Sequence, residues 1–102
     1  MRLFILAVLL ATLHAQSVTA VDPATAKAGD TVSATGAGID NGNVDSLYLT
    51  DGTNDVKCDV VQQTATAIKF KIPGTIKPGR WAVMVHTTKG QFIEEPVKLT
   101  VQ

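Results

Sequence analysis

The chain has 102 residues, and nine lysines and arginines balance nine aspartates and glutamates, so its net charge is zero. A chain this short has room for one domain, and a neutral one lacks the basic surface that nucleic-acid binding requires. Its single cysteine, Cys58, excludes an internal disulfide.

The first residues have the pattern of a secretory signal peptide. Arg2 precedes an uninterrupted apolar run over residues 3–11, and the Leu-His-Ala tripeptide that ends the leader suits cleavage before Gln16. The run is too short for a membrane-spanning helix, which needs about 18 apolar residues. No twin arginine precedes it, and no cysteine follows it to accept lipid. We therefore expect general secretion to the periplasm or the extracellular medium, removal of residues 1–15, and one domain at 16–102 without stable membrane insertion.

Beyond the leader, apolar and polar residues alternate with period two, and no segment sustains helical spacing. The strands predicted from this alternation are 17–21, 30–35, 46–50, 55–62, 67–72, 80–87 and 96–101. Turn-forming residues separate them, and Asp51-Gly52 is the strongest hairpin signal. About seven short strands with regularly spaced turns predict an all-β fold, an antiparallel β-sandwich.

Alternation also assigns one face of each strand to the core. The residues expected to point inward are Val18, Val21, Val32, Ala34, Leu47, Leu49, Val56, Cys58, Val60, Ile68, Phe70, Ile72, Trp81, Val83, Val85, Val97, Leu99 and Val101. The assignment is clearest where Lys69 and Lys71, which must face water, flank Phe70. Cys58 is expected to be a small buried hydrophobe, because a disulfide to another chain would need its face exposed. Pro96 is placed at the first residue of the last strand, where its missing N–H is tolerated.

Three segments resemble an IPT/TIG domain. The segment VTAVDPATAKAGDTVSATGAGI has two apolar residues spaced three apart, a proline, a short loop, Gly-Asp-Thr, an alternating strand and a Gly-x-Gly-aliphatic turn. The residues that carry this pattern are Val18, Val21, Pro23, Gly29, Asp30, Thr31, Val32, Ala34, Gly36, Gly38 and Ile39. The segments TATAIKFKIP and PGRWAVMVHTTKG are similar to the family's stretch before its middle proline and to its Pro-Gly-x-aromatic strand. The resemblance covers about residues 18–101.

The resemblance implies an immunoglobulin-like sandwich and a binding or spacing role. Domains of this family occur in cell-surface receptors, in some transcription factors and beside the catalytic modules of exported bacterial enzymes, so the fold alone does not imply an activity. Loss of Arg2 with the leader leaves eight basic against nine acidic side chains, a net charge of −1. Export and this charge disfavour the DNA-binding branch of the family.

The family pattern also implies an outward sheet face. Its aromatic after Pro-Gly-x points inward, which places Trp81 in the core and turns Ala82, Met84 and His86 outward. The strand at 46–50 is expected beside them, with Tyr48 on the same face. Our first hypothesis is that Tyr48, Ala82, Met84 and His86 bind another exported protein or a second copy of this chain as a weak homodimer. The alternative is an ordinary sheet surface.

The second hypothesis is carbohydrate binding through loop residues at one end of the sandwich. Sugar sites usually need exposed aromatic side chains, whereas Phe70 and Trp81 are expected in the core. Phe92 therefore decides between the two hypotheses. Its exposure beside Tyr48 would favour carbohydrate, and its packing over the end of the sandwich would disfavour it.

No catalytic, cofactor or metal site is predicted. Cys58 and His86 are the only soft ligands beyond the leader, and they lie in different environments. Two loops carry hard oxygen ligands that could suit calcium, namely Asp40, Asn43 and Asp45, and Asp51, Thr53 and Asp55. They lack the EF-hand pattern, so turn formation is the preferred interpretation. There is no Gly-x-Ser-x-Gly motif, and Glu94 and Glu95, adjacent on a strand, are expected to be solvated rather than paired as acid and base.

Overall fold

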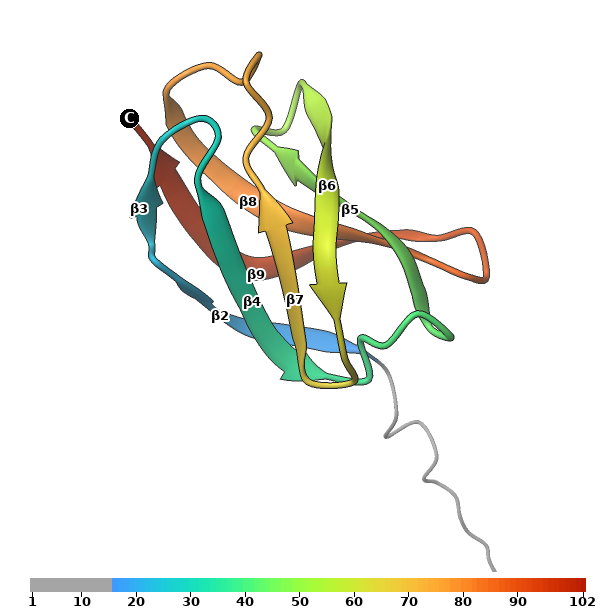
Figure 1. Cartoon of the computed structure of the whole chain (residues 1–102). Coiled ribbons are helices and arrows are strands. Elements are labelled where there is room, and N and C mark those ends of the chain that lie inside the picture. Colours follow the sequence, from blue (N-terminus) through green and yellow to red (C-terminus); the bar gives the residue numbers. More distant parts are fainter. Residues whose placement is uncertain (1–15) are drawn as a thin grey trace, which may run out of the picture.

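The computed structural model describes residues 16–102, which form eight strands and no helix (Figure 1). The strands are β2 (Ser17–Asp22), β3 (Thr25–Ala26), β4 (Thr31–Ala37), β5 (Val44–Thr50), β6 (Asp55–Gln63), β7 (Ala67–Lys71), β8 (Gly79–Thr87) and β9 (Phe92–Val101). The predicted signal peptide lies outside the described residues. Within them, no helix is long and apolar enough to span a membrane.

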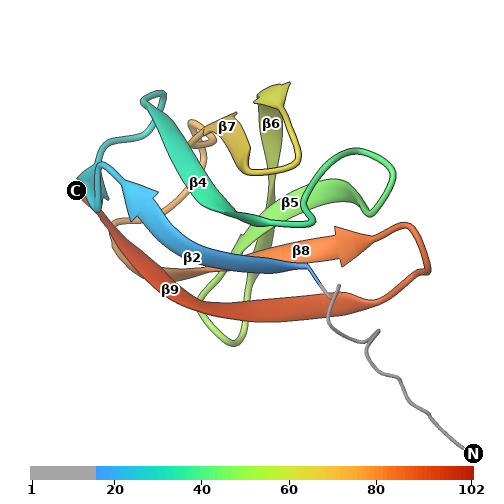
Figure 2. The same cartoon turned by 90° about the horizontal axis from the view of Figure 1, so that it is seen from below.

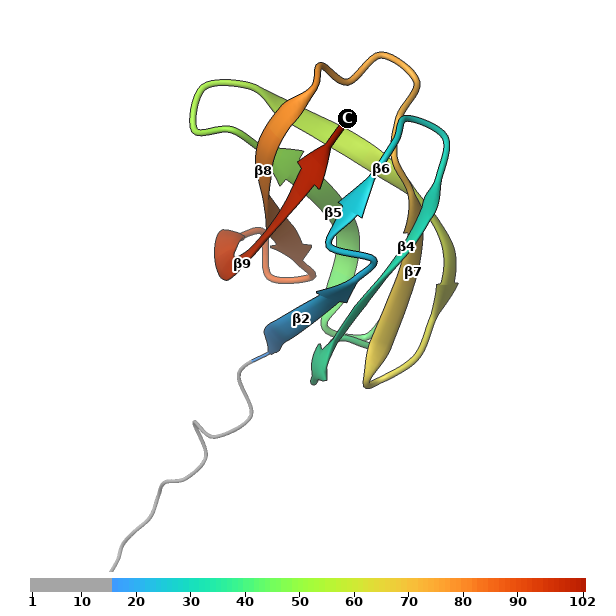
Figure 3. The ribbon, with the colours of Figure 1, turned by 90° about the vertical axis from the view of Figure 1, so that its left-hand side faces the viewer.

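The strands form one hydrogen-bonded sheet that folds over into two layers. Their order is β2-β4-β7-β6-β5-β8-β9-β3, and all neighbours are antiparallel except β3 and β9. Strand β6 joins the layers, because its first part pairs with β5 and its second part with β7. Figure 3 shows β8 and β9 on one side of the molecule and β4 and β7 on the other. The prediction of an all-β, immunoglobulin-like sandwich is confirmed, and the one additional strand, β3, has only two residues.

One cluster of buried apolar side chains fills the space between the layers. The predicted inward residues that are buried are Val18, Val32, Ala34, Leu47, Leu49, Cys58, Ile68, Phe70, Ile72, Trp81, Val83, Val85, Leu99 and Val101. Val21, Val56 and Val97 are partly buried against them. Ala26, Ile39, Val44 and Ile76 also belong to the cluster, although strand alternation did not assign them to the core.

The prediction for Val60 is wrong, because this residue is 38 % exposed. It lies opposite the buried Phe70, on the expected side of β6. However, the pairing of β6 with β5 ends at Cys58, so Val60 lies beyond the point where the two strands separate. A side chain on the correct face stays exposed when no neighbouring strand covers it.

The last strand begins earlier than predicted, at Phe92 rather than Pro96. Ala82 lies opposite Lys98, and Met84 lies opposite Glu94. These two pairs are four positions apart on β9 but only two positions apart on β8, so β9 has extra residues at this point. Pro96 falls within this irregularity. A proline without an N–H is accommodated at such a bulge inside a strand, which explains why the strand continues through it.

Strand β2 lies along β9 on the open side of the sandwich (Figure 2). Glu95, which is only 5 % exposed, makes hydrogen bonds across this contact. Its Oε1 accepts a hydrogen bond from the backbone N–H of Val18, and its Oε2 accepts one from Nε2 of Gln16, both at 2.8 Å. The prediction that Glu95 is solvated is therefore wrong: this carboxylate connects the first strand to the last.

Gly36 of β4 lies opposite Val18 of β2. A Cβ atom added at Gly36 would overlap the backbone carbonyl of Ser17. Because only glycine lacks this atom, the close approach of the two backbones requires glycine at this position.

Candidate functional site

The outer face of β5, β8 and β9 brings the predicted partner-binding residues together. Tyr48 of β5 lies opposite Met84 of β8, and His86 of β8 lies opposite Phe92 of β9. Ala82 is two residues from Met84 on the same face. Directly opposed residues share a face of a sheet, so the four predicted residues and Phe92 form one surface.

This surface differs from the prediction in how much of it is accessible. Ala82 is 3 % exposed and Met84 is 8 % exposed, although neither belongs to the core cluster between the layers. In the register, Met84 is flanked by Tyr48 on β5 and Glu94 on β9. The outer face of β8 is therefore covered mainly by side chains of this same chain. The prediction that Ala82 and Met84 are contact residues is therefore wrong. They form the buried base of this surface, beneath the side chains that a ligand could reach.

Three aromatic rings cover the end of this surface next to the β8–β9 hairpin. Phe92 is 56 % exposed. Its ring centroid lies 5.4 Å from that of Tyr48, with planes at 70°, and 4.5 Å from that of His86, with planes at 51°. The Tyr48–Phe92 contact is edge-to-face and the His86–Phe92 contact is tilted, and such ring contacts hold aromatic side chains in place. We refer to Tyr48, His86 and Phe92 as the aromatic cluster.

A hydrogen-bonded pair of His86 and Asp45 borders the aromatic cluster. Nδ1 of His86 lies 2.6 Å from Oδ1 of Asp45, and Oγ of Ser46 donates to the same oxygen at 3.0 Å. The hydrogen bond with His86 is the main reason why the pKa of the Asp45 carboxyl lies below its usual value. The side chain of Asp45 is 46 % exposed, so its carboxylate remains accessible to solvent.

Together these groups suit a ligand with an apolar face and a polar edge. The exposed ring of Phe92 offers an apolar surface, and its contacts with Tyr48 and His86 fix its orientation. The carboxylate of Asp45 offers an acceptor at the rim. Sequence reasoning singled out Phe92 as an undecided aromatic but did not include it in the site. Its signal was its position two residues after the turn at Lys89-Gly90.

The sandwich also has a hollow of about 510 Å³ at the end formed by the β5–β6 turn and the segment before β8. Its lining residues are Thr53, Asn54, Asp55, Val56, Thr75, Ile76, Lys77 and Trp81. Trp81 is 4 % exposed, and its Nε1 donates to the carbonyl of Lys77 at 2.9 Å. Because the indole is buried and its N–H already has a partner, this hollow offers no aromatic surface for stacking.

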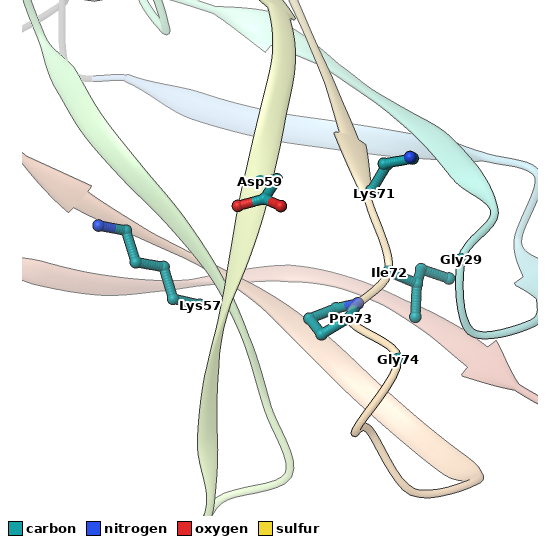
Figure 4. A pocket seen from close by; sticks show the side chains of 7 residues that line it. All are labelled: Gly29, Lys57, Asp59, Lys71, Ile72, Pro73 and Gly74. Atoms are coloured by element: carbon teal, nitrogen blue, oxygen red, sulfur yellow. The ribbon is translucent and has the colours of Figure 1, made fainter.

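A smaller hollow of about 230 Å³ lies where β6 and β7 separate (Figure 4). Lys57, Asp59 and Lys71 are its charged residues. Figure 4 shows the ammonium ends of the two lysines pointing in different directions, with Asp59 between them. The charges do not converge on one point, as a site for an anion would require.

The acidic loops use their carboxylates to form turns. Oδ1 of Asp51 accepts the backbone N–H groups of Thr53 and Asn54 at 2.9 and 2.6 Å. The bond from Asn54 is the main reason why the pKa of Asp51 is lowered. Oδ1 of Asp40 likewise accepts Nδ2 of Asn43 at 3.0 Å. In the part of the chain that the structure describes, no group of three or more His, Cys, Asp or Glu side chains is placed to hold a metal ion.

The burial predicted for Cys58 is confirmed. The residue is 3 % exposed, and its thiol is free. Burial, with a smaller contribution from the negative charge of Asp59, raises the pKa of the thiol to about 12. A protonated, buried thiol is a poor nucleophile, which agrees with a packing role.

The chain matches no protein-family model and no curated protein. Among solved structures, it is similar to SGBP-B of the Bacteroides ovatus mixed-linkage glucan utilization locus, which was solved in complex with a mixed-linkage heptasaccharide. The TM-score is 0.63 and the sequence identity 18 %. The match covers 91 % of this chain but only 23 % of SGBP-B. At this identity the likeness shows a shared fold.

Proposed function

We propose that this protein is a non-catalytic binding module that holds carbohydrate on the aromatic cluster. The observation that carries the proposal is the 56 % exposure of Phe92 directly beside Tyr48. An exposed ring with a fixed orientation suits the apolar face that a sugar ring presents through its C–H groups. The saccharide bound to SGBP-B, a protein of similar fold, is consistent with this use of the fold.

In the proposed complex, one sugar ring stacks on Phe92, and its hydroxyl groups meet the rim of the surface. The carboxylate of Asp45 accepts a hydroxyl hydrogen, and the hydrogen bond from His86 holds that carboxylate in position. The site is an open surface rather than an enclosed pocket. We therefore expect weak binding, with a Kd of roughly 0.1–1 mM for a short oligosaccharide.

The charges around the cluster favour an uncharged glycan. Asp45 borders the cluster, and Glu94 is the β9 residue two positions beyond Phe92, on the same strand face. Two carboxylates at the rim would repel uronic acids or sulfated sugars. We expect neutral glucans to bind more tightly than acidic oligosaccharides of equal length.

The test is a titration of residues 16–102 with a mixed-linkage glucan heptasaccharide, followed by amide chemical shifts in NMR spectra. Shifts should concentrate on β5, β8 and β9, and Phe92→Ala should abolish them. Val61→Ala is the matched control, because Val61 is an equally exposed apolar residue, at 59 %, on β6. Saturable shifts that survive Phe92→Ala, or no shifts with any neutral glucan, would refute the proposal.

Protein docking through the same face is a second candidate function, and the exposed apolar ring of Phe92 is the observation that favours it. Light scattering with size exclusion tests self-association of residues 16–102, with and without reductant. A dimer that persists in reductant but dissociates when Phe92→Lys is introduced would support docking on a second copy. A monomer in every sample would remove that form of the hypothesis.

We also propose that the chain is an exported, divergent IPT/TIG domain. The leader pattern at residues 1–15 supports export. The inward Trp81 and the backbone approach that requires glycine at Gly36 support the family, since both positions belong to the segments that resemble it. Mass spectrometry of the protein secreted by its host would test cleavage before Gln16.

A further inference from the structure

Glu95 is a buried carboxylate whose observed partners carry no charge. Its two oxygens accept hydrogen bonds from the backbone N–H of Val18 and from the side-chain amide of Gln16, each at 2.8 Å. Within residues 16–102, no lysine, arginine or histidine forms an ion pair with it. A side chain that is 5 % exposed is largely removed from water, and a charged group in such a place is usually paired with a group of opposite charge.

Both donors come from the start of the described chain. The side chain of Gln16 donates to one oxygen of Glu95, and the backbone N–H of Val18, two residues later, donates to the other. The α-nitrogen of Gln16 belongs to the residue whose side chain binds one oxygen of Glu95, and it lies two positions before the backbone N–H that binds the other. In an unprocessed chain this nitrogen is part of a neutral peptide bond. The expected cleavage before Gln16 would turn it into a positively charged ammonium group.

We propose that Glu95 is the binding site for the α-ammonium group of Gln16, so that the folded domain recognises its own processed N-terminus. The ammonium group supplies the positive charge that the buried carboxylate lacks, and it adds a charge-assisted hydrogen bond between β2 and β9. The inference is independent of carbohydrate binding, because it concerns the opposite side of β9 from the aromatic cluster.

The proposal has a chemical consequence for Gln16. An N-terminal glutamine can cyclise when its neutral α-amine attacks the side-chain carbonyl carbon Cδ. A bond from the α-nitrogen to Cδ forms, the bond from Cδ to Nε2 breaks, and ammonia leaves with a proton from the amine. A protonated amine has no lone pair for this attack. Glu95, which stabilises the ammonium form and holds Nε2, should therefore slow the loss of ammonia.

The first test compares a protein that starts at Gln16 with one that carries a short Gly-Ser extension before Gln16. Each is made with the native Glu95, with Glu95→Gln, and with Glu94→Gln as the matched control. Urea unfolding measures the folding equilibrium constant of each. We expect the free amine to raise this constant about tenfold with Glu95 or with Glu94→Gln, and to change it less than about twofold with Glu95→Gln. An equal effect of the amine in all three backgrounds would overturn the proposal.

Two measurements keep the proposal testable if Glu95→Gln does not fold. The first is NMR titration of the α-amine of Gln16 in the native protein, whose pKa should be about one unit above the ordinary value of about 7.7–8.0. The second is the rate of ammonia loss by mass spectrometry, which should be slower for the folded protein than for the same chain in urea. An unshifted α-amine pKa, or equal rates of cyclisation, would contradict the proposal.

Discussion

Truncation of Met84 tests whether the outer face of β8 is an internal packing layer. Met84 is 8 % exposed although it lies outside the core between the two layers. Met84→Ala would remove a side chain that is almost entirely buried. Substitutions of this kind cost about 2–5 kcal/mol, and the lower half of that range applies where the surrounding side chains can move to fill the space. Tyr48 and Glu94, the register neighbours of Met84, lie at the surface and can do so.

We therefore expect Met84→Ala to lower the free energy of unfolding by about 2–3 kcal/mol. For a domain of this size, that loss corresponds to a fall in Tm of about 10–20 °C. If Met84 were an ordinary surface residue, the change would stay within about 0.5 kcal/mol. The two interpretations thus differ by more than the error of a denaturation experiment.

The assay is urea unfolding of residues 16–102, which contain the whole described core. Val61→Ala serves as the control, because Val61 is 59 % exposed and should give a change below about 0.5 kcal/mol. The measurement is repeated over a wide range of protein concentration. A midpoint that rises with protein concentration would show that association with a second copy contributes to the stability. A Met84→Ala protein as stable as the Val61→Ala control would refute intramolecular covering.

Three further tests probe other parts of the structure. Gly36→Ala should destabilise the protein by about 1–3 kcal/mol in the same urea assay, because its Cβ would overlap the carbonyl of Ser17 and push β2 from β4; unchanged stability would contradict the close approach. The pKa of Asp45 is lowered in the folded state, so its contribution to stability is present above the unfolded pKa and is lost as the pH falls through the folded value. NMR titration should place the pKa of this carboxyl closer to the usual value when His86 is replaced by alanine. Cys58, with a pKa of about 12 and 3 % exposure, should not react with an aromatic disulfide reagent at pH 8 until urea unfolds the chain, and rapid reaction of the native protein would contradict its burial.

Local patterns in the sequence were sufficient for the class of fold and most of the core. Period-two alternation is a property of neighbouring residues, so it identifies strands wherever one face is buried. The segment with Lys69, Phe70 and Lys71 shows this clearly, because only one register keeps both lysines in water. The burial of Cys58 was predicted on the same kind of evidence, whereas the register of Trp81 was taken from the family resemblance.

The accessibility of the site depended on residues that are distant in sequence. The resemblance to the family implied an outward face for Met84, but whether that face is exposed depends on the side chains that β5 and β9 bring beside it. Similarly, the exposure of Phe92 acquires meaning only because Tyr48, more than forty residues earlier, lies 5.4 Å from it. The candidate site could therefore be placed on the correct strands, but its contact residues could not be chosen.

The sequence by itself determined which residues form strands and which side of each strand is apolar, since both follow from side-chain chemistry within a few positions. Only the tertiary structure decided what covers each side. Val60 remains exposed because β5 and β6 separate beyond Cys58. Glu95 is buried because it meets Val18, 77 positions away in the chain. Burial is a property of neighbours in space, and in a sandwich those neighbours come from strands that local patterns cannot pair.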